Sequence, residues 1–246
     1  MANSNDLAGH VSLITGGARG IGMAAAVALA KRGAKIHLAD ILDCDDAVAE
    51  VEQAGGVAVG HHLDVRDKAS CKAVVDSIYE ADGRLDSLVC NAGVCPPGQP
   101  VGDDEQWHRV IDININGTQN TIAAAWDRMR EAGGGRIVLN SSMAFYQGGL
   151  IVGTEYTASK AALIGMTRHL ARNGGKDGIN VNAVAPGVIE TEMTREFNKP
   201  DLETIPLRRL GTAEDVAGPI SFLCGPESSY MTGTVLNVTG GIILSD

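Results

Sequence analysis

Short runs rich in valine and isoleucine alternate with longer helical patterns along the whole of this 246-residue chain. Such runs predict strands, whereas apolar residues that recur every three or four positions predict helices. The expected strands cover about 10–15, 35–39, 57–63, 85–90, 135–141, 179–185 and 234–238. The expected helices cover about 20–32, 45–54, 67–81, 103–131, 155–173 and 213–224.

This alternation predicts a doubly wound α/β fold, with a mostly parallel sheet of about seven strands and helices on both faces. Parallel strands need long crossover connections, and helices are the usual crossovers. Hydrophobic residues make up 44% of the chain and no linker divides it, so we expect a single domain over 1–246. In sheets of this kind, ligands bind outside the carboxyl ends of the strands.

Charge and composition exclude several classes of protein. A net charge of -10 and the absence of a Lys/Arg cluster argue against a nucleic-acid partner. The start "MANSNDLAGH" has no signal-peptide pattern and the apolar run 24–30 is too short to cross a bilayer, so we expect a cytoplasmic protein without a membrane partner. Five cysteines without a CxxC motif, and a lone His61–His62 pair, predict neither a disulfide scaffold nor a metal site.

The first expected strand runs into a glycine-rich turn, "HVSLITGGARGIGMAAAVALAKRG". Gly16 permits a tight turn, Gly20 lets a pyrophosphate approach the backbone, and Gly22 allows close helix packing. The free N–H groups at the start of the following helix are suited to phosphates. The spacing and its place between strand and helix predict a dinucleotide-binding loop.

The next strand, "KIHLAD", ends in Asp40. A carboxylate there accepts hydrogen bonds from an adenosine ribose and opposes a 2′-phosphate, so Asp40 favours NAD over NADP. Capping of the following turn is the alternative role for Asp40, and Arg19 leaves room for NADP. Asp64, after the third expected strand, either faces the adenine or caps the next helix.

Tyr156 and Lys160 lie four residues apart in "TEYTASKAAL", so they share one face of a helix. A nearby ammonium favours phenolate, and we therefore expect Lys160 to lower the pKa of Tyr156 and make it a general acid and base. From the spacing alone, an ordinary helix surface is the alternative.

The chain carries TGGARGIG, Asp40, Asp64–Val65, CNAG, INING, LNSS, YTASK and APGVIET in this order, and it thereby resembles the short-chain dehydrogenase/reductase family over nearly its whole length. The resemblance implies a Rossmann fold, a nicotinamide cofactor, and a homo-oligomer, either a tetramer or a dimer. It also implies that Tyr156 is the catalytic acid and base. Lys160 would hold the nicotinamide ribose, Ser142 would bond the substrate oxygen, and Asn114 would complete a proton relay. Ser141 stays an alternative to Ser142.

The resemblance further implies a set of cofactor-binding residues. They are Gly16, Arg19, Gly20, Ile21, Gly22, Asp40, Ile41, Asp64, Val65, Asn91, Ala92, Gly93, Tyr156, Lys160, Pro186, Gly187, Ile189 and Thr191. The chain departs from the family pattern at Cys90 and Thr239, and Gly218–Pro219 should bend or interrupt the last helix.

The segment 190–209 has no clear periodicity, which is typical of a substrate-covering loop. Apolar residues expected near the strand ends predict a small, uncharged and fairly hydrophobic alcohol or ketone as substrate. They are Val94, Cys95, Met143, Phe145, Met193 and Phe197. We therefore expect an NAD-dependent oxidoreductase acting on a secondary alcohol or ketone.

Two other functions fit the sequence less well. A 3-oxoacyl-carrier-protein reductase would use NADPH and need a basic docking patch, for which Arg128, Arg130 and Arg172 are candidates. A non-catalytic nucleotide-sensing protein would be expected to have a broken Tyr/Lys/Ser set, and here the set is intact.

Overall fold

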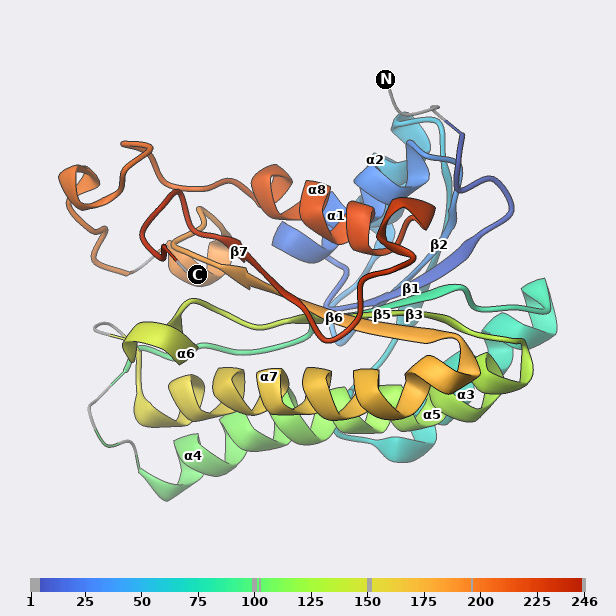
Figure 1. Ribbon diagram of the computed structural model, residues 1–246, viewed down its shortest axis with the longest axis horizontal. Helices are drawn as coiled ribbons and strands as arrows, with labels where there is room; N and C mark the ends of the chain where they lie inside the picture. Colours follow the sequence, from blue (N-terminus) through green and yellow to red (C-terminus); the bar gives the residue numbers. More distant parts are fainter. Residues whose placement is uncertain (1–4, 99–100, 102, 150–151, 196, 245–246) are drawn as a thin grey trace.

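The computed structural model describes residues 5–98, 101, 103–149, 152–195 and 197–244. It contains one seven-stranded sheet in the order β3-β2-β1-β4-β5-β6-β7, and every neighbouring pair is parallel (Figure 1). The strands are β1 Val11–Thr15, β2 Lys35–Asp40, β3 Val57–His62, β4 Ser87–Cys90, β5 Gly135–Asn140, β6 Ile179–Pro186 and β7 Val235–Val238. The predicted doubly wound fold is confirmed, and each expected strand is present.

Helices cover both faces of the sheet. The helices of three turns or more are α1 Gly20–Ala30, α3 Lys68–Asp82, α5 Thr118–Glu131, α7 Thr154–Gly174 and α8 Ala213–Leu223, and the shorter ones are α2 Asp45–Gln53, α4 Asp104–Ile111 and α6 Ala144–Gln147. In Figure 1, α1, α2 and α8 lie above the sheet, whereas α3, α4, α5 and α7 lie below it. Short 3₁₀ turns η2 Gly175–Asp177, η3 Glu192–Thr194, η4 Leu202–Thr204 and η5 Pro226–Ser228 complete the chain.

Each face of the sheet has its own hydrophobic core. Leu13 and Leu139 belong to the core under α3, α5 and α7, whereas their neighbours Ile14 and Val138 belong to the core under α1 and α8. Successive strand residues point to opposite faces, so a strand buried on both faces must be apolar at nearly every position. This explains why the strands read as continuous Val/Ile/Leu runs rather than as alternating patterns.

Two helical expectations need correction. The expected helix over 103–131 is three segments, because a π-helical turn, η1 Asp112–Gly117, separates α4 from α5. The helix around Pro219 is not interrupted, since α8 continues on both sides of the proline. The residue before the proline is Gly218, and because it lacks a Cβ, the usual clash between that atom and a proline ring is relieved.

The strand order places a crevice at the end of the sheet where the strands reach their carboxyl ends. After β3 the chain returns to the other side of β1 to form β4, so the connections leaving β1 and β4 diverge. Such a switch point opens a binding crevice at the carboxyl ends of the strands.

Candidate active site

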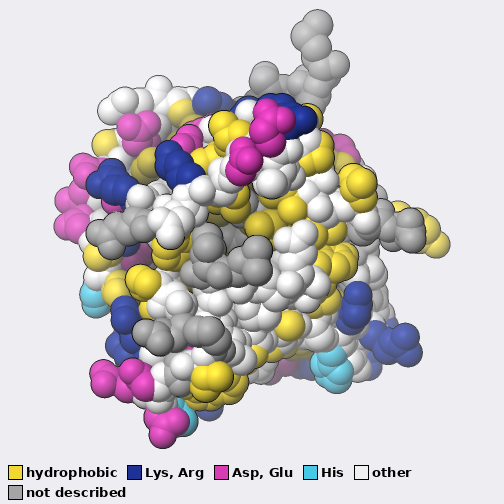
Figure 2. Space-filling view, turned by 90° about the vertical axis from the view of Figure 1, so that its left-hand side faces the viewer, with side chains coloured by type: hydrophobic (Ala, Val, Ile, Leu, Met, Phe, Trp, Pro, Cys, Tyr) yellow, Lys and Arg dark blue, Asp and Glu magenta, His cyan; other side chains and the backbone are white. Residues whose placement is uncertain are grey.

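A cleft of about 450 Å³ lies at the carboxyl ends of the strands. It contains every catalytic and cofactor-binding residue predicted from the sequence except Gly22 and Asn114, which lie behind its wall. Figure 2 views the molecule from the side on which α6 and the C-terminus lie in Figure 1. Charged side chains there lie mainly around the periphery, and hydrophobic side chains are spread across the middle.

The glycine loop between β1 and α1 forms the floor of the cleft. Gly16 has a φ of +65°, which favours glycine, and Gly20 lines the cleft beside it. A Cβ on Gly22 would lie 2.1 Å from the backbone oxygen of Gly16, so the helix approaches the loop too closely for any side chain. Gly22 thus shapes the loop without contacting the cleft. The loop can accept a pyrophosphate at the start of α1.

The end of β2 supports both roles considered for Asp40. Its carboxylate accepts hydrogen bonds from the N–H of Ala18 in the glycine loop and from the N–H of Leu42 in the following turn, each at 3.1 Å. Asp40 therefore fixes the loop and caps the turn, while it also lines the cleft next to Ile41. A negative charge at this edge disfavours a phosphate.

Asp64 pairs with Arg66 rather than capping a helix. Both carboxylate oxygens accept hydrogen bonds from the Arg66 guanidinium, and this pairing lowers the pKa of Asp64. The cap of α3 is Asp67, whose side chain accepts from the N–H of Ala69. The capping alternative for Asp64 is therefore wrong, and Asp64 and Val65 line the cleft.

A chain of amide side chains joins the strand ends to Lys160. The Asn91 side chain donates to the backbone oxygen of Gly16 at 2.8 Å, and its oxygen accepts from Asn140 at 2.8 Å. The backbone oxygen of Asn140 in turn accepts from Lys160 Nζ at 2.8 Å. Ala92 and Gly93, which follow Asn91, line the cleft beside this chain. Three strands thus hold one ammonium group in place.

Tyr156, Lys160 and Ser142 meet on one wall of the cleft. Lys160 Nζ lies 5.6 Å from the centre of the Tyr156 ring, one helical turn away on α7. Ser142 follows β5 and interacts with the Tyr156 phenol, and its Oγ accepts from the N–H of Ala144. Ser141 is buried, and its Oγ donates to the backbone oxygen of Lys160 at 2.8 Å. Because the hydroxyl of Ser141 is engaged by α7, the geometry favours Ser142 as the group that meets a substrate.

Burial controls the ionisation of Tyr156 and Lys160. It raises the pKa of the Tyr156 phenol above its usual value, with a further upward effect from Cys95 and an opposing one from Ser142. It also lowers the pKa of Lys160 to about 8. The shift of the Tyr156 pKa is thus upward, opposite to the direction expected from its spacing to Lys160. The Lys160 ammonium donates to the backbone oxygen of Asn140, and burial of the phenol is the main cause of the upward shift.

Asn114 lies in the π-helical turn and its side chain is fully engaged. Its Oδ1 accepts from the N–H of Val94 at 2.8 Å, and its Nδ2 donates to the oxygen of Val94 and to Ser159 Oγ, both at 3.0 Å. The widened π turn brings this buried amide to the loop after β4 and to α7. Asn114 therefore links the loop after β4 to α7, behind the wall of the cleft that carries Tyr156 and Lys160. Its part in a proton relay stays a prediction.

The segment after β6 forms the far end of the cleft. Pro186, Gly187, Ile189 and Thr191 line it. The side chain of Ile189 is buried, and within the described part of the chain its N–H donates to no other group. The Thr191 N–H donates to Thr194 Oγ1 at 3.1 Å, which fixes the turn. An amide-bearing ligand can be held here by backbone groups.

The predicted apolar substrate wall is only partly assembled. Val94 and Met193 line the cleft, whereas Cys95, Met143, Phe145 and Phe197 do not. Phe145, on the short helix α6, packs against the core under α7 and against the ring of Tyr146. The sequence did not reveal α6, which turns this side chain away. Residue 196 of the expected loop 190–209 lies outside the described residues.

The cleft also contains residues that the sequence reasoning missed. They are Leu42, Leu63, Arg66, Arg109, Ile113, Asn140, Glu192 and Thr194. The sequence could have assigned Asn140 to the cleft, since it is a polar residue that ends an apolar strand directly before the serine pair. No sequence pattern points to Arg109, because a single arginine on an exposed helix is ordinary.

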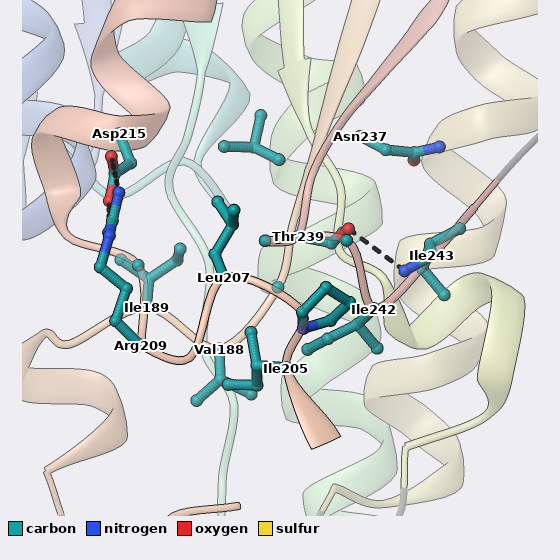
Figure 3. A pocket seen from close by; sticks show the side chains of 16 residues that line it. Val188, Ile189, Ile205, Leu207, Arg209, Asp215, Asn237, Thr239, Ile242 and Ile243 are labelled. Carbon is teal, nitrogen blue, oxygen red and sulfur yellow. Dashed lines mark hydrogen bonds and ion pairs between the residues drawn. The ribbon is translucent and has the colours of Figure 1, made fainter. Parts of the chain in front are cut away.

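A second cavity of about 450 Å³ lies between the segment 205–211 and the C-terminal residues 237–243 (Figure 3). It shares Gly187 and Ile189 with the cleft. Its side chains are mostly apolar, and Arg209 and Asp215 neutralise one another at one side. It contains none of the predicted catalytic residues, so the cleft is the candidate active site.

Two further features concern the described ranges as a whole. No group of His, Cys, Asp and Glu side chains in them is arranged to hold a metal ion; His61 is hydrogen-bonded to His37. No helix in these ranges is long and apolar enough to cross a membrane.

Comparison with known proteins agrees with the geometry. A family model described as enoyl-(acyl carrier protein) reductase matches residues 16–243. The chain is 37% identical to the short-chain type dehydrogenase/reductase y4mP of Sinorhizobium fredii, with 97% of this chain and 99% of the relative covered. It is 40% identical to the 3-oxoacyl-[acyl-carrier-protein] reductase FabG of Thermotoga maritima, with the same coverage. A crystal structure from Agrobacterium tumefaciens with bound NADP superposes with a TM-score of 0.89 at 35% identity, covering 98% of each chain.

Proposed function

The chain belongs to the short-chain dehydrogenase/reductase family, and from this premise we propose that it interconverts a secondary alcohol and a ketone with NAD(H). One observation carries the proposal: Ser142, Tyr156 and Lys160 lie together on the wall of a cleft whose floor is a dinucleotide-type glycine loop. The nicotinamide supplies or accepts the hydride when it is bound. The protein must then manage one proton and one developing negative charge.

Tyr156 is suited to donate that proton. Because burial raises the pKa of its phenol, Tyr156 is protonated at neutral pH and can give its proton to a carbonyl oxygen that becomes an alkoxide. Ser142 beside it can hold the same oxygen. With a pKa of about 8, Lys160 is mostly charged at pH 7, and we assign its ammonium, 5.6 Å from the centre of the Tyr156 ring, to holding the nicotinamide ribose. Alcohol oxidation uses the same groups in reverse.

The cofactor preference rests on Asp40. Its carboxylate is held by two N–H groups at the edge where an adenosine ribose would lie, so a 2′-phosphate would meet a fixed negative charge. Arg66 does not offset this charge, because it is paired with Asp64. Arg19 is exposed and lines the same end, which keeps NADP(H) as the alternative. The NADP-bound structural relative supports that alternative.

A 3-oxoacyl-carrier-protein reductase is the second candidate, because the Thermotoga maritima relative carries that name. The arginines that were candidates for its basic docking patch argue against this function, because two of them are paired with carboxylates. Arg128 pairs with Asp76 and Arg130 with Asp127, so these cations are partly neutralised. Val94 and Met193 suit a small hydrophobic ketone instead.

We include assembly into a homo-oligomer in the proposal, since β7 is an edge strand and Leu207, nearby, is exposed.

The test follows the oxidation of NADH and of NADPH by the purified protein. Aromatic, cyclic and aliphatic ketones are compared with one 3-oxoacyl thioester. The proposal predicts turnover of at least one uncharged ketone, with a higher kcat/KM for NADH than for NADPH. Turnover of the thioester alone, with NADPH preferred, would establish the second candidate. Tight NADH binding without turnover in either direction would favour a nucleotide-sensing protein.

A further inference from the structure

A buried carboxylate lies directly beside the catalytic tyrosine and outside the cleft. Glu155 precedes Tyr156 in the first turn of α7, and its side chain has no exposed surface. Its Oε1 accepts a hydrogen bond from Gln106 Nε2 at 2.6 Å. Its Oε2 has no hydrogen-bond partner in the part of the chain that the structure describes. Burying a carboxylate with an unpaired oxygen is costly, and such groups concentrate at functional sites.

Two hydrogen bonds tie α7 to the α4–η1 segment on either side of Tyr156. Gln106 on α4 holds Glu155, and Asn114 on η1 holds Ser159 at 3.0 Å. Glu155 and Ser159 are four residues apart, so they share the helix face next to the one that carries Tyr156. Ser159 Oγ also lies 2.7 Å from the backbone oxygen of Tyr156, to which it donates. The tyrosine is thus held at both ends of its turn.

The local backbone is built to admit the carboxylate. A Cβ on Gly153, the residue that caps α7, would lie 2.1 Å from Glu155 Oε1, so the Glu155 side chain occupies the space that a side chain at 153 would need. A negative charge in the first turn is also favoured by the helix dipole. The position therefore accommodates Glu155 specifically, and the contact with Gln106 orients it.

We propose that Glu155 is a positioning residue: its hydrogen bond with Gln106 fixes the turn of α7 that carries Tyr156. As a contribution to turnover, this role rests on the proposed function.

Three variants test this role. Glu155→Gln keeps an oxygen that can accept from Gln106, whereas Gln106→Met removes the hydrogen bond and keeps a similar shape. Glu105→Gln, which removes an exposed charge from the same helix α4, is the matched control.

For each variant we measure kcat, KM, the Kd for NADH and the amide hydrogen exchange of the α7 segment 154–160. We expect Gln106→Met to lower kcat about tenfold or more with the Kd for NADH little changed, since a misplaced acid slows chemistry rather than binding. The same variant should exchange the amides of this segment faster than the wild type. Glu155→Gln should lose less activity than Gln106→Met, and Glu105→Gln should match the wild type.

Unchanged kcat in Gln106→Met, even with a lower melting temperature, would overturn the positioning role and leave Glu155 a structural residue. If the wild type turned over none of the ketones, the proposed function would fail, but the hydrogen-exchange comparison would still decide the positioning role, because unchanged exchange in Gln106→Met would overturn it.

Discussion

Replacing Lys160 with methionine should stabilise the folded protein while abolishing turnover. The ammonium is buried, with 5% of the residue exposed, and burial lowers the pKa of Lys160 from 10.5 to about 8. Because the folded state binds this proton more weakly than the unfolded state, the charged lysine destabilises the fold at neutral pH. Methionine fills a similar volume without a charge.

The size of the effect follows from the pKa change. A lowering from 10.5 to about 8 corresponds to roughly 3 kcal/mol, at about 1.4 kcal/mol for each pKa unit. The loss of the hydrogen bond to Asn140 offsets about 1 kcal/mol of the gain. The variant should therefore unfold with a free energy about 2 kcal/mol higher at pH 7. Between pH 8 and 10.5 the wild type loses this penalty, so its stability should rise relative to the variant.

The free energy of unfolding of both proteins is measured in urea, at one protein concentration and at half-unit steps from pH 7 to 10.5. Taking the difference between the two free energies cancels the titration of groups that the proteins share. We expect this difference in the free energy of unfolding to shift by about 3 kcal/mol in favour of the wild type across that range. A difference that stays constant with pH would refute the conclusion that Lys160 is a charged group held at a desolvation cost.

Three further predictions concern other parts of the site. Gly22→Ala should destabilise the fold by about 1–3 kcal/mol because its Cβ would meet the oxygen of Gly16, whereas Gly165→Ala, in open space on α7, should be neutral or stabilising; thermal unfolding distinguishes them. Ser142→Ala should lower kcat about 100-fold, whereas Ser141→Ala should chiefly lower stability, by about 1 kcal/mol; comparable losses of kcat would contradict the assignment. Asp40→Ala should raise the ratio of kcat/KM for NADPH over NADH by at least about tenfold; an unchanged ratio would remove the basis for NAD preference.

The sequence was sufficient to predict the sheet and most of the cleft. Strands buried on both faces read as continuous apolar runs, and helical crossovers between them leave few topologies. The glycine loop, Asp40, Tyr156 and Lys160 could be assigned because each occupies a strand end or a helix face that the sequence pattern defines.

Other features depend on three-dimensional contacts that no local pattern encodes. The π turn at η1 adds one residue to a helical repeat, and nothing in "DINING" distinguishes it from a continuous helix. The direction of the Tyr156 pKa shift could not be predicted from its spacing to Lys160, since burial of the phenol is its main cause. Glu155 reads as an ordinary exposed residue of a first helical turn, and only packing against Gln106 reveals its burial.

The central claim is that Tyr156 transfers the proton during hydride transfer. The most direct test measures NADH oxidation with the best ketone substrate, and NADH binding by fluorescence titration, for Tyr156→Phe and for the exposed control Tyr146→Phe. We expect Tyr156→Phe to lose about 1,000-fold in kcat while its Kd for NADH stays close to that of the wild type, and Tyr146→Phe to retain activity. Near-wild-type turnover in Tyr156→Phe would contradict the assigned role and the mechanism built on it.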